Sequence, residues 1–147
     1  MIIEHEELSK ILPHKGKMFI IGRITNANPA EWTIESETEI TPDFMFYDKN
    51  AGGAPNYACF EIVAQTIAAL TGLIARESAA TPKMGFILSV SNLHFDFDII
   101  KSGEKVKVRT FRDSQVENVY SVKAEIYIDD KFSGEGKITA MVAENDK

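Results

Sequence analysis

PNYACFEIVAQTIAALTGLIA, residues 55–75, is the part of the sequence that is most informative about the fold. Its one formally charged side chain is Glu61, and Ala, Ile, Leu, Val and Phe occur all round a helix drawn through it. We therefore predict a helix over residues 55–75, with Pro55 at or just before the first turn, where its missing N–H costs nothing. A helix that is apolar on all sides is expected to be buried on most of them.

A membrane span is the alternative interpretation of this stretch, because about 20 apolar residues could cross a bilayer. Polar side chains interrupt it at Glu61, Gln65, Thr66 and Thr71, and the sequence shows neither a second span nor a basic flank. We therefore expect the central helix of a soluble core, and no contact with a membrane.

Around this stretch the hydrophobic period changes to two, which is typical of strands with one solvated face. The strand candidates, in chain order, are Met18–Ile24, residues 32–40, Met84–Val90, residues 105–110, residues 120–128 and roughly Lys131–Ala143. Asp129 and Asp130 supply turn residues before the last strand, in which Gly134 and Gly136 indicate a bulge or a close backbone approach. One long buried helix among about six mostly antiparallel strands predicts an α+β fold whose sheet wraps round the helix.

Length and composition exclude several classes of protein. The 147 residues give a single domain over 1–147, with 44% hydrophobic and 26% charged residues, as in ordinary globular proteins. The single cysteine excludes an intrachain disulfide and a zinc site built from several cysteines, so we expect no metal. The sequence contains no dinucleotide-binding motif, so we expect no cofactor. A net charge of -6 argues against nucleic-acid binding, and the acidic start MIIEHEELSK does not resemble a signal peptide, which favours a cytoplasmic location.

Glu61 is the first candidate for a functional residue, because a lone carboxylate in an apolar helix is costly unless it is paired or hydrogen-bonded. Gln65 follows one turn later and Tyr57 precedes by one turn, so the three side chains form a stripe on one face. The alternative is that Glu61 reaches the rim of the core and caps a backbone donor.

Three segments resemble hotdog-fold 3-hydroxyacyl-[acyl carrier protein] dehydratases. LPHKGKMFIIGRI, residues 12–24, is similar to the LPHR-P-M-L opening of that family, and APNYACFEIVAQTIAAL, residues 54–70, is similar to its P-G-V-L-x-E-x-A-Q stretch, where x is hydrophobic. FILSVSNLHFDFDIIKSGEKVKV, residues 86–108, resembles the strand and turn that follow. The run AQTIAA resembles the branch associated with aryl-polyene pathways.

The resemblance implies a hotdog fold that dimerises by joining two sheets edge to edge, with active sites at the dimer interface. It implies removal of water from a 3-hydroxyacyl thioester, carried by an acyl carrier protein or by coenzyme A, to give a 2-enoyl thioester. Glu61 matches the catalytic acid, and the backbone N–H that polarises the thioester carbonyl matches Asn56 after Pro55. We expect Gln65 to hold the Glu61 carboxyl, Tyr57 to line the substrate site, and an apolar acyl tunnel to run beside the helix.

The family's catalytic histidine has no counterpart at the matching position. Fourteen residues before Glu61 the sequence has Tyr47, and a phenol is a poor base near neutral pH. Tyr47 is either a site residue that donates a hydrogen bond or a loop aromatic packed for its area. Three interpretations stay open: Glu61 performs both proton transfers, His14 or His94 enters the site, or the chain is a non-catalytic acyl-binding subunit of a heterodimer. A thioesterase is the enzymatic alternative, since hotdog thioesterases also use a helix carboxylate and helix-start donors.

Other polar residues have both a functional and a structural interpretation. Asp48 is either a site carboxylate or a turn residue, and Cys59 is either a nucleophile or, as we expect, a small buried side chain. Lys105, Lys107 and Arg109 share one strand face, which is either a docking surface for an acidic carrier protein or a solvated face balanced by other charges.

Overall fold

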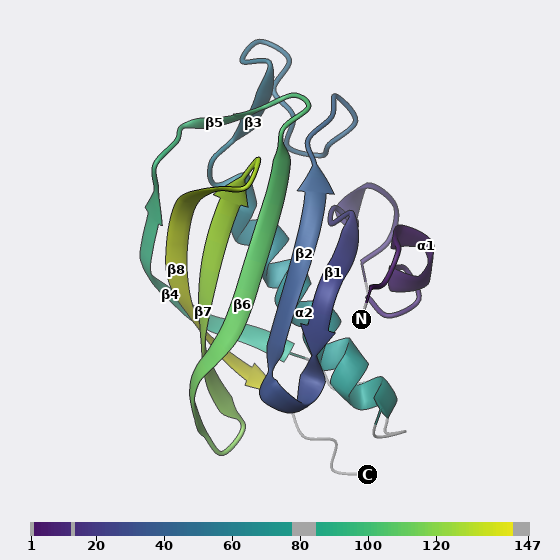
Figure 1. Cartoon of the computed structure of the whole chain (residues 1–147), viewed down its shortest axis with the longest axis vertical. Helices are drawn as coiled ribbons and strands as arrows, with labels where there is room; N and C mark the ends of the chain where they lie inside the picture. Colours follow the sequence, from purple (N-terminus) through teal and green to yellow (C-terminus); the bar gives the residue numbers. More distant parts are fainter. Residues whose placement is uncertain (1, 13, 78–84, 143–147) are drawn as a thin grey trace.

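The computed structural model describes residues 2–12, 14–77 and 85–142 and consists of one long helix enclosed by a curved sheet (Figure 1). The helices are α1 (His5–Leu8) and α2 (Ala58–Glu77), with short 3-10 turns at Gly16–Met18 and Pro29–Glu31. The strands are β1 (Arg23–Asn28), β2 (Thr33–Glu39), β3 (Gly53–Pro55), β4 (Gly85–Phe95), β5 (Ile99–Lys101), β6 (Lys105–Val116), β7 (Val119–Ile128) and β8 (Lys131–Val142).

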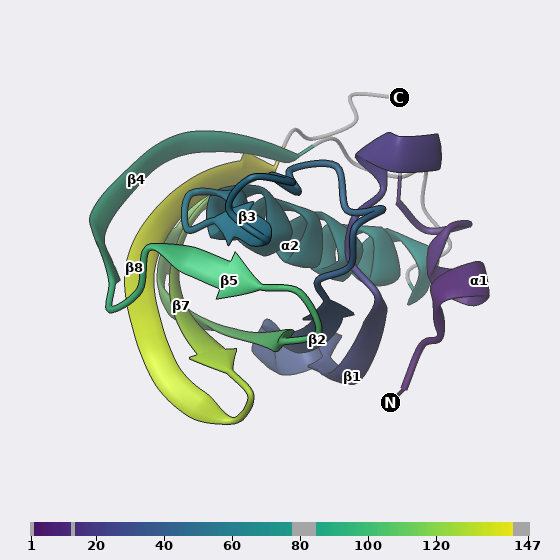
Figure 2. The same cartoon turned by 90° about the horizontal axis from the view of Figure 1, so that it is seen from above.

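The main sheet has six strands in the order β1-β2-β6-β7-β8-β4, and every neighbouring pair is antiparallel. Seen from above, it curls round α2 (Figure 2). Strands β3 and β5 form a separate antiparallel pair beside the start of α2. The predicted α+β plan with about six wrapping strands is therefore confirmed, and β4 and β1 are its two edges.

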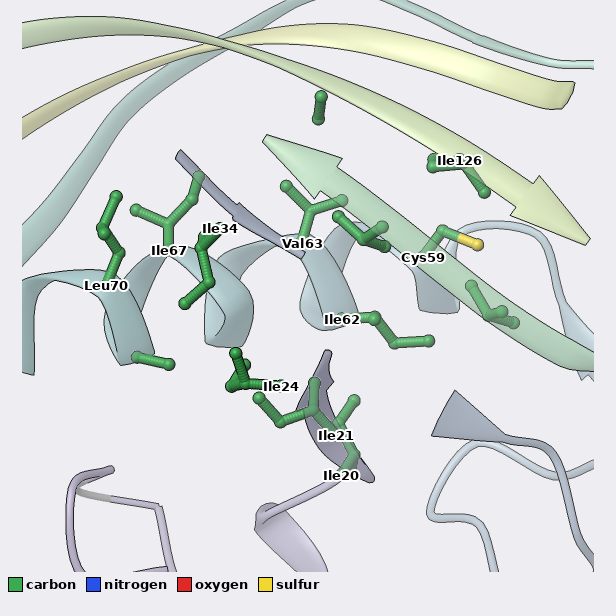
Figure 3. Packing of buried hydrophobic residues seen from close by; sticks show 14 of the residues in the cluster. Ile20, Ile21, Ile24, Ile34, Cys59, Ile62, Val63, Ile67, Leu70 and Ile126 are labelled. Atoms are coloured by element: carbon green, nitrogen blue, oxygen red, sulfur yellow. The ribbon is translucent and has the colours of Figure 1, made fainter. Parts of the chain in front are cut away.

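The core lies between α2 and the concave face of the sheet. Helix side chains that include Cys59, Ile62, Val63, Ile67 and Leu70 are at most 5% exposed, and they pack among buried residues of the surrounding strands such as Ile34 and Ile126 (Figure 3). The sheet alternates as the period of two predicts: in β2 every second side chain is buried and the others are partly solvated. Burial of this apolar surface is the main favourable contribution to folding.

Two local predictions were wrong. Pro55 ends β3 and pairs with Ile99, so the helix begins three residues later, at Ala58. Only the end of the predicted strand Met18–Ile24 is a strand: Met18 belongs to a 3-10 turn, and β1 begins at Arg23. The apolar start of this stretch has no neighbouring strand to pair with among the described residues. Hydrogen bonds from a side chain of α2, described below, hold it instead.

The turn between β7 and β8 agrees with its residues. Asp129 and Asp130 both have positive φ, 49° and 67°, as the primed hairpin turns require, and Asp is among the residues that tolerate this region. Gly134 is needed because the backbones of β8 and β4 approach each other closely there, and not because of its φ angle. A Cβ at this position would lie 2.7 Å from the carbonyl oxygen of His94. Both predictions for this hairpin are confirmed.

The helix segment Ala58–Arg76 is long and apolar enough to cross a bilayer, but 67% of it is buried inside the molecule. The core helix of a soluble protein has the same length and composition, so the helix is weak evidence for a membrane span.

Candidate active site

Glu61 lies in the first turn of α2 and is half-buried. Within the described residues its carboxylate has neither a hydrogen bond nor an ion pair, so it does not cap a backbone donor there. Exposure falls along the predicted stripe: Tyr57 is 64% exposed, Glu61 is intermediate and Gln65 is completely buried. A carboxylate that is partly desolvated and unpartnered, at the start of an apolar helix, is available for proton exchange with a bound ligand.

The start of α2 offers free donors next to Glu61, but they are not the ones the resemblance implied. The N–H of Asn56 donates to the carbonyl oxygen of Asp98 at 2.9 Å, and its side-chain amide donates to Phe97 O at 2.9 Å. Asn56 therefore ties the helix start to the β4–β5 connection, and its N–H is occupied. The next two N–H groups, of Tyr57 and Ala58, have no acceptor among the described residues, as is usual at a helix N-terminus.

Gln65 does not hold the Glu61 carboxyl. Its side-chain oxygen accepts from the N–H of Ile20 at 3.0 Å, and its nitrogen donates to Met18 O at 2.6 Å. Both polar ends of this fully buried amide are thus used to fix residues 18–20 against the helix. Gln65 has a structural role, and the expectation that it positions Glu61 was wrong.

Tyr47 and Asp48 lie in the loop between β2 and β3. Tyr47 is half-buried and packs against the core, and its N–H donates to Phe44 O at 2.9 Å. Asp48 is exposed, and its carboxylate accepts from the N–H groups of Asn50 and Ala51, as in an Asx turn. Asp48 is therefore the turn residue of the two interpretations, and neither side chain forms a hydrogen bond with Glu61.

Among the described residues, neither His14 nor His94 contacts Glu61. On either side of His14 in the sequence, Ile11 packs against Gly72 and Met18 is held by Gln65. Those helix positions lie about 6–16 Å beyond Glu61 along the helix axis. The Nδ1 atom of His14 is buried without a partner among the described residues.

His94 belongs to the solvent side of the edge strand β4. Its Nε2 lies 2.6 Å from Oδ1 of Asp96, and both side chains are more than half exposed. The neighbouring residue Leu93 packs against Gly136 on the inner side of the sheet, and strand alternation turns His94 the other way. His94 therefore points away from the helix of its own chain.

Cys59 is buried and free, and the low dielectric of its surroundings raises the pKa of its thiol from 9.0 to about 12. A thiol that is neutral at physiological pH is a poor nucleophile, which supports the structural interpretation. Within residues 2–12, 14–77 and 85–142, no group of three His, Cys, Asp or Glu side chains could hold a metal ion.

The basic face of β6 is not a free cationic surface. Lys105, Lys107 and Arg109 pair in register with Glu39, Glu37 and Glu35 of β2. Arg109 lies 3.4 Å from Glu35 and 3.8 Å from Glu125, and Lys107 lies 3.4 Å from Asp130. Arg109 and Lys107 are thus paired with neighbouring carboxylates, and Lys105 faces Glu39 across the two strands.

Sequence reasoning missed two features of this region: the internal bond of the Asn56 N–H and the free donors of Tyr57 and Ala58. Both depend on where the 96–98 segment passes the helix, which residue type alone does not reveal. Beside the helix, where an acyl tunnel was expected, described residues line an apolar pocket of about 10 Å³, which has room for about one water molecule and not for an acyl chain.

A buried apolar helix enclosed by an antiparallel sheet, with one carboxylate in its first turn, places this chain among hotdog-fold proteins. Over residues 6–147 the sequence matches the family described as ApeP-like, ApeP dehydratase. The chain belongs to the ApeP-like dehydratase family.

Curated relatives and solved structures agree with this membership. The 3-hydroxyacyl-[acyl-carrier-protein] dehydratase FabZ of Rickettsia typhi is 25% identical over 97% of each chain. FabZ of Campylobacter fetus is 25% identical over 97% of this chain and 99% of its own. Among solved structures, the dehydratase heterocomplex ApeI:P from Xenorhabdus doucetiae has a TM-score of 0.83 at 17% identity, covering 94% of this chain and 91% of that one.

The same fold also occurs in a second class of protein. A hypothetical thioesterase from Streptococcus pneumoniae with coenzyme A has a TM-score of 0.63 at 11% identity, covering 84% of this chain and 87% of that one. The hotdog fold expected from the sequence is thereby confirmed, and both the dehydratase resemblance and the aryl-polyene-type branch agree with the family found.

Proposed function

We propose that this chain dehydrates a 3-hydroxyacyl thioester to a 2-enoyl thioester, with the acyl group carried by an acyl carrier protein. The observation that carries the proposal is the unpartnered, half-buried carboxylate of Glu61, one turn from the free N–H groups of Tyr57 and Ala58. The family membership and the FabZ relatives support the same reaction.

In this mechanism the thioester oxygen accepts hydrogen bonds from the N–H groups of Tyr57 and Ala58. The positive end of the helix dipole stabilises negative charge on that oxygen, which makes the α-carbon proton more acidic. A base removes the α proton, the C–O bond to the 3-hydroxyl breaks, and Glu61 in its protonated form gives its proton to the departing hydroxide. The products are water and the enoyl thioester, and Glu61 is left as a carboxylate.

The base is the open part of this mechanism. Tyr47 occupies the position of the family's histidine, and no described contact brings His14 or His94 to Glu61. We propose that the chain works as a dimer joined at the exposed edge strand β4, as the resemblance implies, so that a second subunit can complete the site. A homodimer would have to use Glu61 for both proton transfers or a histidine of the second copy.

A non-identical partner that brings the base is the second candidate function. Tyr47 favours it, because in that arrangement this chain needs no base of its own. The structural neighbour ApeI:P is a dehydratase heterocomplex, which supports the same arrangement here. In this case the chain would bind acyl groups and contribute Glu61 or the helix-start donors to a shared site in the cytoplasm.

The test is mass spectrometry of 3-hydroxyacyl thioesters incubated with the wild type, Glu61→Gln and Glu31→Gln. Glu31 is an exposed residue of the 29–31 turn and serves as the matched control. We expect loss of water with the wild type and with Glu31→Gln, and a rate about 10²–10⁴ times lower with Glu61→Gln. Full activity of a folded Glu61→Gln would refute the central role of this carboxylate.

The alternatives give different products or requirements. Free thiol and a 3-hydroxy acid instead of an enoyl thioester would identify a thioesterase. No reaction by a folded wild type alone, with dehydration restored by a second hotdog subunit, would identify the partner function. Parallel assays with carrier-protein and coenzyme A thioesters would define the carrier.

A further inference from the structure

Asn56 immediately precedes the residues whose free N–H groups begin α2, and it forms two hydrogen bonds to neighbouring backbone carbonyls. Its N–H donates to Asp98 O, and its side-chain Nδ2 donates to Phe97 O, both at 2.9 Å. Its own carbonyl accepts from the N–H of Cys59 at 3.0 Å, in the first turn of the helix. Asn56 therefore joins the helix start to residues 97–98 through both its backbone and its side chain.

The two carbonyls belong to a connection between β4 and β5 that is held at both ends. At one end the N–H of Asp96 donates to Ser133 O at 2.8 Å, which continues the pairing of β4 with β8. At the other end Ile99 pairs with Pro55 in the two-stranded β3–β5 sheet, which lies beside the start of α2 (Figure 2). A helix start that is bound to this connection is thus fixed relative to both sheets.

The side-chain bond adds orientation to what the backbone bond provides. A single hydrogen bond leaves the bonded group free to rotate about it, whereas two bonds from one residue to adjacent carbonyls also fix its direction. The N–H groups of Tyr57 and Ala58 follow Asn56 directly in the chain, so their directions depend on how Asn56 is held. Donors stabilise charge on a reacting oxygen when they are aimed in advance at the place where that charge develops.

Asparagine suits this position because its amide donates a hydrogen bond without carrying a charge. An aspartate in its place would have no hydrogen for Phe97 O. Its carboxylate would also lie near the helix-start donors and oppose negative charge on an oxygen bound there. An acidic residue next to a helix N-terminus nevertheless stabilises the helix. Compared with Asn56→Ala, Asn56→Asp therefore favours stability and disfavours activity.

We infer that Asn56 is a positioning residue for the donors at the start of α2. Its two bonds to residues 97–98 orient the N–H groups of Tyr57 and Ala58 toward the thioester oxygen. The inference rests on the proposed function and adds a residue to its mechanism. Asn56 acts through the direction of the two donors, so its loss weakens binding of the transition state, in which the oxygen carries most charge, more than binding of the substrate.

The first experiment measures kcat and KM for a 3-hydroxyacyl thioester with the full chain, in the assembly that dehydrates it. We expect kcat to fall about 10–100-fold in Asn56→Ala with little change in KM, because a misplacement of about 1 Å in a site costs up to about 10²-fold. Asn56→Asp should have the lower kcat of the two variants and the higher free energy of unfolding. A merely structural role for Asn56 would instead make activity follow stability.

The matched control is Asn28→Ala. Asn28 is exposed at the end of β1, and its side chain does not cap the 3-10 turn that follows. Its kcat and KM should equal those of the wild type. If Asn56→Ala and Asn56→Asp are folded and keep the wild-type kcat, the inference is wrong while the dehydratase proposal stands.

Infrared spectroscopy of a bound thioester separates the inference from the proposed reaction. The probe is butyryl-pantetheine with ¹³C at the thioester carbonyl, which has no 3-hydroxyl group and cannot be dehydrated. Hydrogen bonds to the carbonyl oxygen lower the frequency of its C=O stretch. We expect this shift in the wild type and Asn28→Ala, and a smaller shift in Asn56→Ala and Asn56→Asp.

That pattern of shifts supports the inference even if the wild type dehydrates no substrate, in which case only the proposed reaction fails. Equal C=O frequencies for the probe bound to all four proteins would overturn the inference, whatever the wild type does to a 3-hydroxyacyl thioester.

Discussion

Cys59 lies two residues before Glu61 on α2, and its side chain is buried among the core residues (Figure 3). Burial raises the pKa of its thiol to about 12, so at pH 8 the thiol is almost entirely protonated and little reactive thiolate is present. We predict that iodoacetamide does not label native Cys59 at pH 8 and labels it rapidly in denaturant. Mass spectrometry after timed exposure measures both rates, and fast labelling of the native protein would contradict this burial.

The raised thiol pKa also predicts how stability depends on alkaline pH. Because the folded-state pKa lies above the unfolded-state value of 9.0, the contribution of Cys59 is fully present below pH 9 and is lost as the pH rises toward about 12. Urea unfolding across this range should show a fall in the free energy of unfolding that is smaller in Cys59→Ala. Equal slopes in the two proteins would contradict the assignment.

At the scale of the element, α2 is anchored to the N-terminal segment by Gln65. Replacing Gln65 by Ala leaves the buried N–H of Ile20 without its acceptor, which costs about 1–3 kcal/mol; it also removes the bond to the part-buried carbonyl of Met18 and the packing of a fully buried side chain. We therefore expect Gln65→Ala to lower the free energy of unfolding by about 2–5 kcal/mol in urea titrations. A stable Gln65→Ala that has lost only activity would instead restore the role of positioning Glu61.

The helix and most strands could be predicted because the spacing of their apolar residues follows from burial. The strands are buried on one face and the helix on all faces. The alternation of apolar and polar side chains in residues 105–110 and 120–128 is a property of the local sequence, and β6 and β7 show the matching alternation of burial. The start of α2 could not be placed as well, because Pro55 fits both a first helical turn and a strand. Pairing of β3 with β5, from a distant part of the chain, decides between them.

At the scale of the whole molecule, the site depends on contacts that no local pattern contains. Glu61 was identifiable because a lone charge in an apolar helix is conspicuous in the sequence alone. The occupied N–H of Asn56 and the role of Gln65 arise from segments about 40 residues away, namely residues 97–98 and 18–20. The two histidines were candidates by residue type, and the topology carries His94 to the outer side of an edge strand.

The outer face of the sheet carries a charge ladder, defined as Glu35, Glu37 and Glu39 of β2 opposite Arg109, Lys107 and Lys105 of β6. Cross-strand pairs of opposite charge contribute roughly 0.2–1 kcal/mol each, and partly exposed pairs lie in the lower part of that range. Reversing the three basic residues to Glu would set six carboxylates side by side. We therefore expect a loss of about 1–3 kcal/mol in the free energy of unfolding, which added salt reduces by screening.

A compensating variant tests whether this face is structural or a docking surface. Reversing the three glutamates to Lys as well restores opposite charges across the two strands, so the six-residue swap should recover most of the stability in thermal and urea unfolding. Because the wild-type cations are already balanced, carrier-protein affinity should be the same for the swapped protein and the wild type. If the swapped protein is stable but no longer binds the carrier protein, the basic side chains of β6 form part of the binding surface for the carrier. The surface that meets the carrier would then lie on β6, and not on the side where α2 begins.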